Sequence, residues 1–143
     1  MINVDAFSIL LVDDEMDFLE TLMKRLKKRK LNVAGVGTGE EALEWLAQHQ
    51  VDVVVLDVRM PGMDGIETLK EIRKLYPMIE VVMLTGHANV EVAIQGMEIG
   101  AFDYLMKPMD IDELLYKLQD AYKKKFLQEQ RIRNREEVMG SGG

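Results

Sequence analysis

Two apolar runs of the chain end in carboxylates. Asp57 closes residues 53–56 (Val-Val-Val-Leu), and Asp13 and Asp14 close residues 9–12 (Ile-Leu-Leu-Val). Uninterrupted aliphatic runs of this length are typical of strands that are buried on both faces of a parallel sheet. When two such parallel strands are neighbours and the strand order of the sheet reverses between them, their carboxyl ends flank a single crevice. We therefore expect the three carboxylates to lie close together.

Three neighbouring carboxylates repel one another unless a cation lies among them. Mg²⁺ is small and hard and prefers oxygen ligands, commonly one or two carboxylates, with water or phosphate oxygens in the other positions. The pattern thus predicts a weak Mg²⁺ site that is open to solvent. Such a site suits phosphoryl transfer, with Asp57 as the nucleophile and an aspartyl phosphate as the product.

Two further strand ends supply groups that phosphoryl chemistry needs. Lys107 follows residues 103–106 and would bring a positive charge, and Thr85 follows residues 81–84 and would bring a hydroxyl. Gly86 has no side chain that could obstruct a ligand. The first, third, fourth and fifth strands would each contribute to one site.

The elements that must position these residues alternate in type along the chain. Strand patterns occupy residues 8–12, 32–36, 53–57, 80–84 and 103–106. Helix patterns separate them, with N-cap signals at Thr38, Asp64 and Asp110, each followed three residues later by a glutamate. The fourth helix carries Ile94 and Met97 at the spacing of one apolar face. Five such units predict an α/β fold, a parallel sheet covered by helices on both faces, with the short second strand at an edge.

Composition excludes several classes of protein. The chain has 143 residues, enough for one domain with a core, and no cysteine, which excludes disulfides and thiolate metal sites. Its formal net charge of -7 disfavours nonspecific binding to nucleic acid or to an anionic membrane. The first residues do not resemble a signal peptide, and no apolar run approaches the roughly 20 residues of a membrane span. A cytoplasmic protein is expected.

The composition becomes basic and polar after Lys123. We expect residues 1–125 to form the folded domain and residues 126–143 to form a helical extension with a flexible tail that begins at Met139. The extension fits a solvated helix end, or a truncated linker or coiled coil that leads to an output domain absent from this chain. Direct contact with nucleic acid is disfavoured, because no interleaved aromatic residues accompany the charge.

Four motifs together resemble the receiver (REC) domain of two-component response regulators, most closely the nitrogen-regulation type. They are Asp13-Asp14, Asp57-Val58-Arg59-Met60-Pro61-Gly62-Met63-Asp64-Gly65, Thr85-Gly86-His87-Ala88 and Gly100-Ala101-Phe102-Asp103-Tyr104-Leu105-Met106-Lys107-Pro108. The resemblance covers residues 8 to 123. It implies a flavodoxin-like, doubly wound five-stranded sheet of order 2-1-3-4-5 with five helices, and a phosphoprotein that acts in phosphorelay signal transduction. A sensor histidine kinase would donate the phosphoryl group to Asp57.

The resemblance also implies a role for each residue of the site. Mg²⁺ would bind Asp14, Asp57 and the backbone carbonyl of Arg59, with Asp13 acting through a water molecule. Lys107 and Thr85 would contact the phosphate, assisted by the backbone amides of Val58 and Gly86. Tyr104 would be a switch that turns inward when Thr85 moves toward the phosphate. The surface of the fourth helix, fifth strand and fifth helix would change, and it could form a homodimer.

Other interpretations of these residues remain open. Asp13 and Asp14 could be N-caps of the first helix, and Tyr104 an ordinary buried tyrosine with a bonded hydroxyl. The main functional alternative is a Mg²⁺-dependent phosphohydrolase with an aspartyl nucleophile, although no Asp-x-Asp element follows the first strand. A flavin- or nucleotide-binding module is a third, but the acidic residues after the first strand would repel a phosphate there. A receiver would not be an enzyme in the usual sense, since it would only hydrolyse its own acyl phosphate slowly.

Overall fold

The structure, a computed structural model, describes residues 7–58, 64–86 and 90–141 of the chain. Its strands are β1 (Ser8–Val12), β2 (Asn32–Val36), β3 (Val53–Asp57), β4 (Glu80–Thr85) and β5 (Asp103–Met106), and its helices are α1 (Met16–Lys28), α2 (Gly39–Gln48), α3 (Gly65–Leu75), α4 (Val90–Ile99) and α5 (Ile111–Ser141). The five expected strands are confirmed, and the fourth is one residue longer than predicted because Thr85 still belongs to it.

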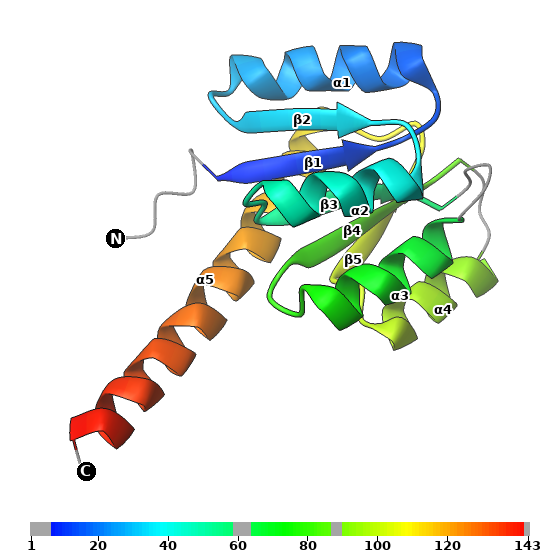
Figure 1. The fold of residues 1–143 in the computed structure, drawn as a ribbon. Coiled ribbons are helices and arrows are strands. Elements are labelled where there is room, and N and C mark those ends of the chain that lie inside the picture. Colours follow the sequence, from blue (N-terminus) through cyan, green and yellow to red (C-terminus); the bar gives the residue numbers. More distant parts are fainter. Residues whose placement is uncertain (1–6, 59–63, 87–89, 142–143) are drawn as a thin grey trace.

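The strands form one parallel sheet of order β2-β1-β3-β4-β5. The predicted fold is therefore confirmed, with β2 as one edge strand. All the strands are parallel, and the order in which the chain adds strands to the sheet reverses between β1 and β3. Helices α1 and α5 cover one face of the sheet, and α2, α3 and α4 cover the other (Figure 1). This arrangement brings the carboxyl ends of β1 and β3 side by side at one edge of the layers.

Alternate residues of the central strands face two separate hydrophobic cores. Leu11 and Val55 pack with α1 and α5, whereas Leu10 and Val54 pack with α2 and α3. Because both faces are covered, the strands need apolar residues at every position, which explains the unbroken runs in the sequence. Each such side chain contributes roughly 1.5–3 kcal/mol through burial, so the two carboxylate-bearing strands are held firmly.

All three predicted N-caps accept a hydrogen bond from an amide in the first turn of their helix. The Thr38 Oγ1 atom accepts a hydrogen bond from the Glu41 amide at 3.1 Å, and Asp64 Oδ1 accepts one from the Glu67 amide at 2.8 Å. Asp110 instead accepts from the amide two residues on, at 3.0 Å. These caps fix where α2, α3 and α5 begin relative to the strands that precede them.

The apolar face predicted for α4 is turned outward. Ile94 is 53% exposed and Met97 is 40% exposed, although Ala93 is buried. The helix approaches the sheet through Gly96, where an added Cβ atom would lie 2.2 Å from the sulfur of Met83. This close approach leaves Ile94 and Met97 on the surface, where they line a hollow with Tyr104.

Two ion pairs hold α5 against the amino ends of β3 and β4. The Lys125 amine lies 2.9 Å from Asp52 Oδ1, and the other oxygen of Asp52 accepts a hydrogen bond from the Ser8 amide at 2.8 Å. The Lys124 amine lies 3.4 Å from one oxygen of Glu80 and 3.5 Å from the other. These contacts determine the direction in which α5 leaves the body of the domain.

Helix α5 continues without a break past the expected domain boundary at residue 125. The ring of Tyr122 stacks on Phe7 with centroids 4.7 Å apart, and the helix then projects away from the sheet (Figure 1). Residues 139–141, expected to begin a flexible tail, belong to the helix. No helix in the described ranges combines the length and the apolarity that crossing a bilayer requires.

Candidate functional site

Three carboxylates meet at the carboxyl ends of β1 and β3. Asp57 is the last residue of β3, and Asp13 and Asp14 follow β1, whose register with β3 pairs Val12 with Leu56. One oxygen from each carboxylate lies within 4.8 Å of the others. Asp13 and Asp57 are buried, whereas Asp14 is exposed, so the cluster is reached from solvent on the Asp14 side.

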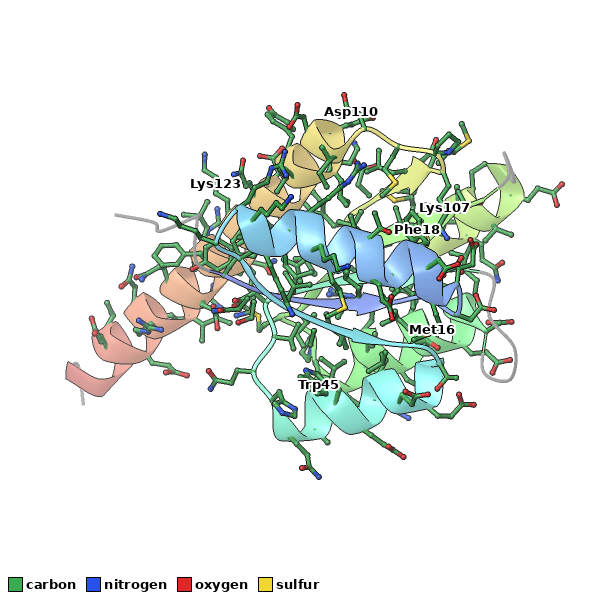
Figure 2. All side chains as sticks on the ribbon, turned by 90° about the horizontal axis from the view of Figure 1, so that it is seen from above. Met16, Phe18, Trp45, Lys107, Asp110 and Lys123 are labelled. Carbon is green, nitrogen blue, oxygen red and sulfur yellow. The ribbon has the colours of Figure 1, made fainter. Side chains whose placement is uncertain are left out.

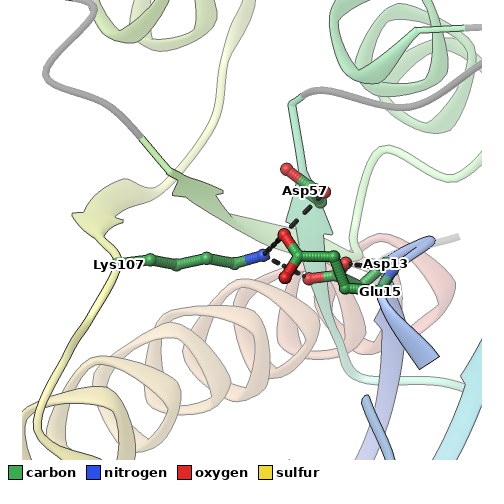
Figure 3. A network of polar contacts seen from close by, with 4 residues as sticks. All are labelled: Asp13, Glu15, Asp57 and Lys107. Carbon is green, nitrogen blue, oxygen red and sulfur yellow. Dashed lines mark hydrogen bonds and ion pairs between the residues drawn. The ribbon is translucent and has the colours of Figure 1, made fainter. Parts of the chain in front are cut away.

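Lys107 brings one positive charge to this cluster. Its amine lies 2.7 Å from Asp13 Oδ2, 3.3 Å from Glu15 Oε1 and 3.9 Å from Asp57 Oδ2 (Figure 3). The backbone N–H of Lys107 also donates to the Thr85 carbonyl oxygen at 2.8 Å, which fastens the end of β5 to the end of β4. The side chain of Lys107 is only 11% exposed. It is therefore an inward-facing lysine and not a solvated one.

Electrostatics favour the charged form of Lys107. Burial lowers the pKa of its amine, but the hydrogen bond to Asp13 and the charges of Asp57, Asp13 and Glu15 together outweigh that effect. The pKa of Lys107 is consequently raised above its ordinary value. The amine remains a fixed cation over the physiological pH range.

Asp13 has both of its carboxylate oxygens engaged by the protein. Oδ2 accepts from Lys107, and Oδ1 accepts from the Glu15 amide at 2.9 Å. The N-cap position of α1 is Glu15, whose side chain makes no capping hydrogen bond. The interpretation of Asp13 and Asp14 as N-caps of α1 is therefore wrong, because neither residue occupies the N-cap position.

The donor set fits a hard divalent cation. All three clustered side chains offer carboxylate oxygens, and Asp14 leaves the site open to water and phosphate oxygens. Asp13, Asp14, Glu15 and Asp57 outnumber the single amine of Lys107, so the cluster retains a negative charge that Mg²⁺ would offset. The resemblance to receiver domains also predicted that the backbone carbonyl of Arg59 binds Mg²⁺, but Arg59 lies outside the described residues.

The remaining predicted residues lie at neighbouring strand ends. Thr85 is buried at the end of β4, and the Val58 amide donates to the Leu84 carbonyl oxygen at 3.1 Å. An added Cβ atom at Gly86 would meet no atom within 4 Å, so space is open beside it. Tyr104 is 41% exposed, which contradicts its interpretation as a buried tyrosine.

Sequence reasoning missed three residues that shape the site. Glu15 contacts the Lys107 amine, and the Phe18 ring lies 4.2 Å from it on α1. Gly65 is required at the start of α3, because a Cβ atom there would lie 2.4 Å from Val58 Cα and 2.7 Å from the Asp57 carbonyl oxygen. Glu15 could have been found from its position next to the acidic pair. The Phe18 contact has no signal in the sequence.

Comparison with known proteins agrees with this geometry. Residues 9–119 match the response regulator receiver domain. The chain is 43% identical over 117 residues to the transcriptional regulatory protein ZraR of Escherichia coli strain K12, which covers 82% of this chain and 26% of that protein. It is 42% identical over 102 residues to the DNA-binding transcriptional regulator NtrC of the same strain, covering 71% of this chain and 22% of NtrC. A solved receiver domain from Clostridium thermocellum has a TM-score of 0.81 at 33% identity, covering 85% of this chain and 98% of that one.

The chain belongs to the response regulator receiver domain family, and it resembles the nitrogen-regulation type within it. It is a signalling domain of two-component systems, which confirms the resemblance seen in the sequence. Members of this family normally use Mg²⁺, in keeping with the acidic cluster. The chain spans about a quarter of the length of the curated relatives that it matches.

Proposed function

We propose that Asp57 accepts a phosphoryl group from a phosphohistidine of a sensor histidine kinase. An Asp57 carboxylate oxygen attacks phosphorus, the P–N bond breaks, and its electron pair remains on the imidazole nitrogen of the kinase. The observation that carries this proposal is the buried Asp57 carboxylate 3.9 Å from the Lys107 amine, in a cluster where the described carboxylates outnumber the described cations. Such a transfer requires mainly alignment and neutralisation of charge.

Each neighbouring residue has a proposed task in that transfer. The Lys107 amine neutralises charge on the phosphoryl oxygens, and the Thr85 hydroxyl and the Gly86 amide donate hydrogen bonds to them. The Val58 amide, to which the resemblance gives the same role, would first have to release the Leu84 carbonyl oxygen to which it now donates. Asp14, Asp57 and the Arg59 carbonyl would hold Mg²⁺, and Asp13 would hold it through water, since both Asp13 oxygens already accept hydrogen bonds. Mg²⁺, when bound, would supply positive charge that offsets the negative charge of the carboxylates and of the incoming phosphoryl group.

The phosphoryl group would act as a switch through Thr85 and Tyr104. Its added charge draws the Thr85 hydroxyl inward, and the exposed Tyr104 ring then follows into the space that Thr85 vacates. The surface of α4, β5 and α5, with Ile94 and Met97 exposed on it, would change its affinity for a second copy. Because ZraR and NtrC are named transcriptional regulators, we propose that a longer protein carries a C-terminal output domain. We also propose that the protein is located in the cytoplasm.

The phosphohydrolase alternative is not favoured. The receiver match extends over residues 9–119, which hold the whole acidic cluster and Lys107. We expect slow loss of the group by self-catalysed hydrolysis of the acyl phosphate, but no turnover of general phosphate esters.

Mass spectrometry after treatment with acetyl phosphate and Mg²⁺ tests this function. We expect one added phosphoryl group, which is absent with EDTA and absent in Asp57→Ala. The Asp52→Ala variant is a matched control, since it alters a carboxylate at the other end of the same strand and should still be phosphorylated. An adduct that survives in Asp57→Ala would contradict the assignment.

A further inference from the structure

We call the side of the sheet where the strands begin its amino edge, and the side where they end, which holds the acidic cluster, its carboxyl edge. A groove lies at the amino edge. It is formed between the C-terminal end of α2 and the turn from α1 to β2, and its volume is about 570 Å³. That volume falls within the range of roughly 300–1,000 Å³ that small-molecule sites occupy. Trp45, which lines it, lies well apart from Lys107 in Figure 2. The groove is therefore a separate feature from the phosphoryl site.

The groove exists because small and polar residues face α2 at this edge. The residues of this face that line the groove are Ser8, Asn32 and Ala34. Two residues further along the same strands, the larger side chains of Leu10 and Val36 fill the core. Helix α2 ends at Gln48 and does not extend over them. The floor of the groove thus combines a hydroxyl and an amide with apolar surface, as small-molecule sites commonly do.

The rim of the groove is strongly basic. Six of the seven residues 24–30 are lysine or arginine, in a chain with a formal net charge of -7. Lys27 and Lys30 line the groove, and neither has an ion-pair partner among the residues that the structure describes. Asp52, which binds the Ser8 amide beside the floor, is already paired with Lys125. Within the described ranges, the groove therefore presents positive charge that no acidic side chain offsets.

The backbone at Lys30 sets this lysine apart from its neighbours. Its φ is +65°, the left-handed conformation that glycine usually occupies after a helix. Interaction with the partial negative charge at the end of α1 accounts for Lys27 and Lys28, which lie in its last turn. The charge at the helix end does not explain why Lys30, whose backbone conformation favours glycine, is a lysine.

A pair of stacked rings forms one wall of the groove. The Trp45 and His49 rings lie 3.7 Å apart between centroids and 9° from parallel. His49 Nδ1 lies 3.1 Å from the Trp45 carbonyl oxygen and donates to it, which orients the imidazole ring. Flat aromatic surfaces of this kind stack on planar ligands, as they do on nucleic-acid bases.

From these features we propose that the groove binds a nucleotide. Its phosphate groups would lie against Lys27 and Lys30, and its base would stack on the wall made by Trp45 and His49. No other side-chain set in the described residues combines a groove of this size with unpaired lysines and stacked rings.

Fluorescence of Trp45 tests the proposal directly, because it is the only tryptophan in the chain. ATP is titrated into the 143-residue chain in EDTA, which keeps metal from the acidic cluster, and calorimetry on the same samples counts the sites. We expect saturable quenching at one site. Lys27→Gln/Lys30→Gln should weaken binding about tenfold or more, because charge-assisted hydrogen bonds are lost. Lys24→Gln/Lys28→Gln, on the same helix but outside the groove, should bind like the wild type.

Two further variants separate binding from folding and from the phosphoryl site. Lys30→Gly relieves the left-handed backbone and should keep or raise the thermal midpoint while ATP binding weakens. Asp57→Asn should bind ATP unchanged, so loss of phosphorylation and loss of this site are distinguishable. The absence of saturable binding, equal weakening by the two lysine pairs, or equally tight binding of inorganic tripolyphosphate would overturn the proposal.

Discussion

The two edges of the sheet both bring carboxylates and lysines together, but in different proportions. At the amino edge Asp52 and Glu80 each pair with a different lysine, Asp52 with Lys125, which also contacts Glu129, and Glu80 with Lys124. At the carboxyl edge Asp13, Asp57 and Glu15 share Lys107, and Asp14 adds a fourth carboxylate that has no ion-pair partner in the described part of the chain. Strand β3 takes part in both, since Asp52 directly precedes it and Asp57 is its last residue.

The difference separates a structural arrangement from a functional one. The Asp52–Lys125 and Glu80–Lys124 pairs balance their charges and fix α5, so these two carboxylates leave no surplus negative charge for a metal ion to neutralise. The surplus of negative charge at the carboxyl edge is unfavourable by itself and becomes favourable when a cation binds. The charge balance therefore supports the proposal that Mg²⁺ binds at the carboxyl edge. Variants that alter this balance should have opposite effects on the two edges.

The largest expected effect follows from breaking the balance at the amino edge. Lys124→Met removes the partner of Glu80, whose carboxylate is fully buried and whose Oε1 has no hydrogen bond within the described residues. We expect a loss of about 2 kcal/mol in the free energy of unfolding, less than for a wholly buried pair because Lys124 is 44% exposed. Urea denaturation measures it, with Lys123→Met on the exposed neighbouring residue as the control. Equal stability of the two variants would show that the pair has no structural role.

A smaller effect of opposite sign is expected at the carboxyl edge. Asp57→Asn removes one of several like charges, so in EDTA it should stabilise the domain by about 1 kcal/mol. Saturating Mg²⁺ should stabilise the wild type more than the variant, because the wild type binds the ion more tightly. Thermal unfolding with and without Mg²⁺ measures both. A destabilised Asp57→Asn in EDTA would mean that the carboxylates are already balanced.

The smallest effect concerns the pH dependence of the Asp52–Lys125 pair. Burial lowers the pKa of Lys125, but the hydrogen bond and charge of Asp52, followed by those of Glu129, raise it above the ordinary value. Stability from a raised lysine pKa is fully present below the unfolded value of about 10.4 and is lost as pH rises through the folded value. The difference in unfolding free energy between wild type and Lys125→Gln should stay constant from about pH 7 to pH 9 and shrink above about pH 10.4. A difference that shrinks below pH 9 would contradict the raised pKa.

The sequence predicted the carboxyl edge better than the amino edge, for a physical reason. Asp57 and Lys107 end apolar strands, and in a parallel sheet such ends must meet, so local patterns sufficed. The pairs at the amino edge join residues 73 and 44 positions apart, and no periodicity relates them. The packing of α4 also escaped prediction, because it depends on the contact between Gly96 and Met83 and not on the apolar face.

The binding position of a metal ion tests the central claim most directly. Mn²⁺, which replaces Mg²⁺ at oxygen-ligand sites and broadens nearby NMR signals, can be added in substoichiometric amounts to the ¹⁵N-labelled chain. We predict that the amides of Asp13, Asp14, Val58 and Gly86 broaden first, while those of Asp52 and Glu80 stay sharp, and that Asp14→Asn weakens the effect. Broadening that is equal at both edges, or strongest around Asp52 and Glu80, would contradict the account.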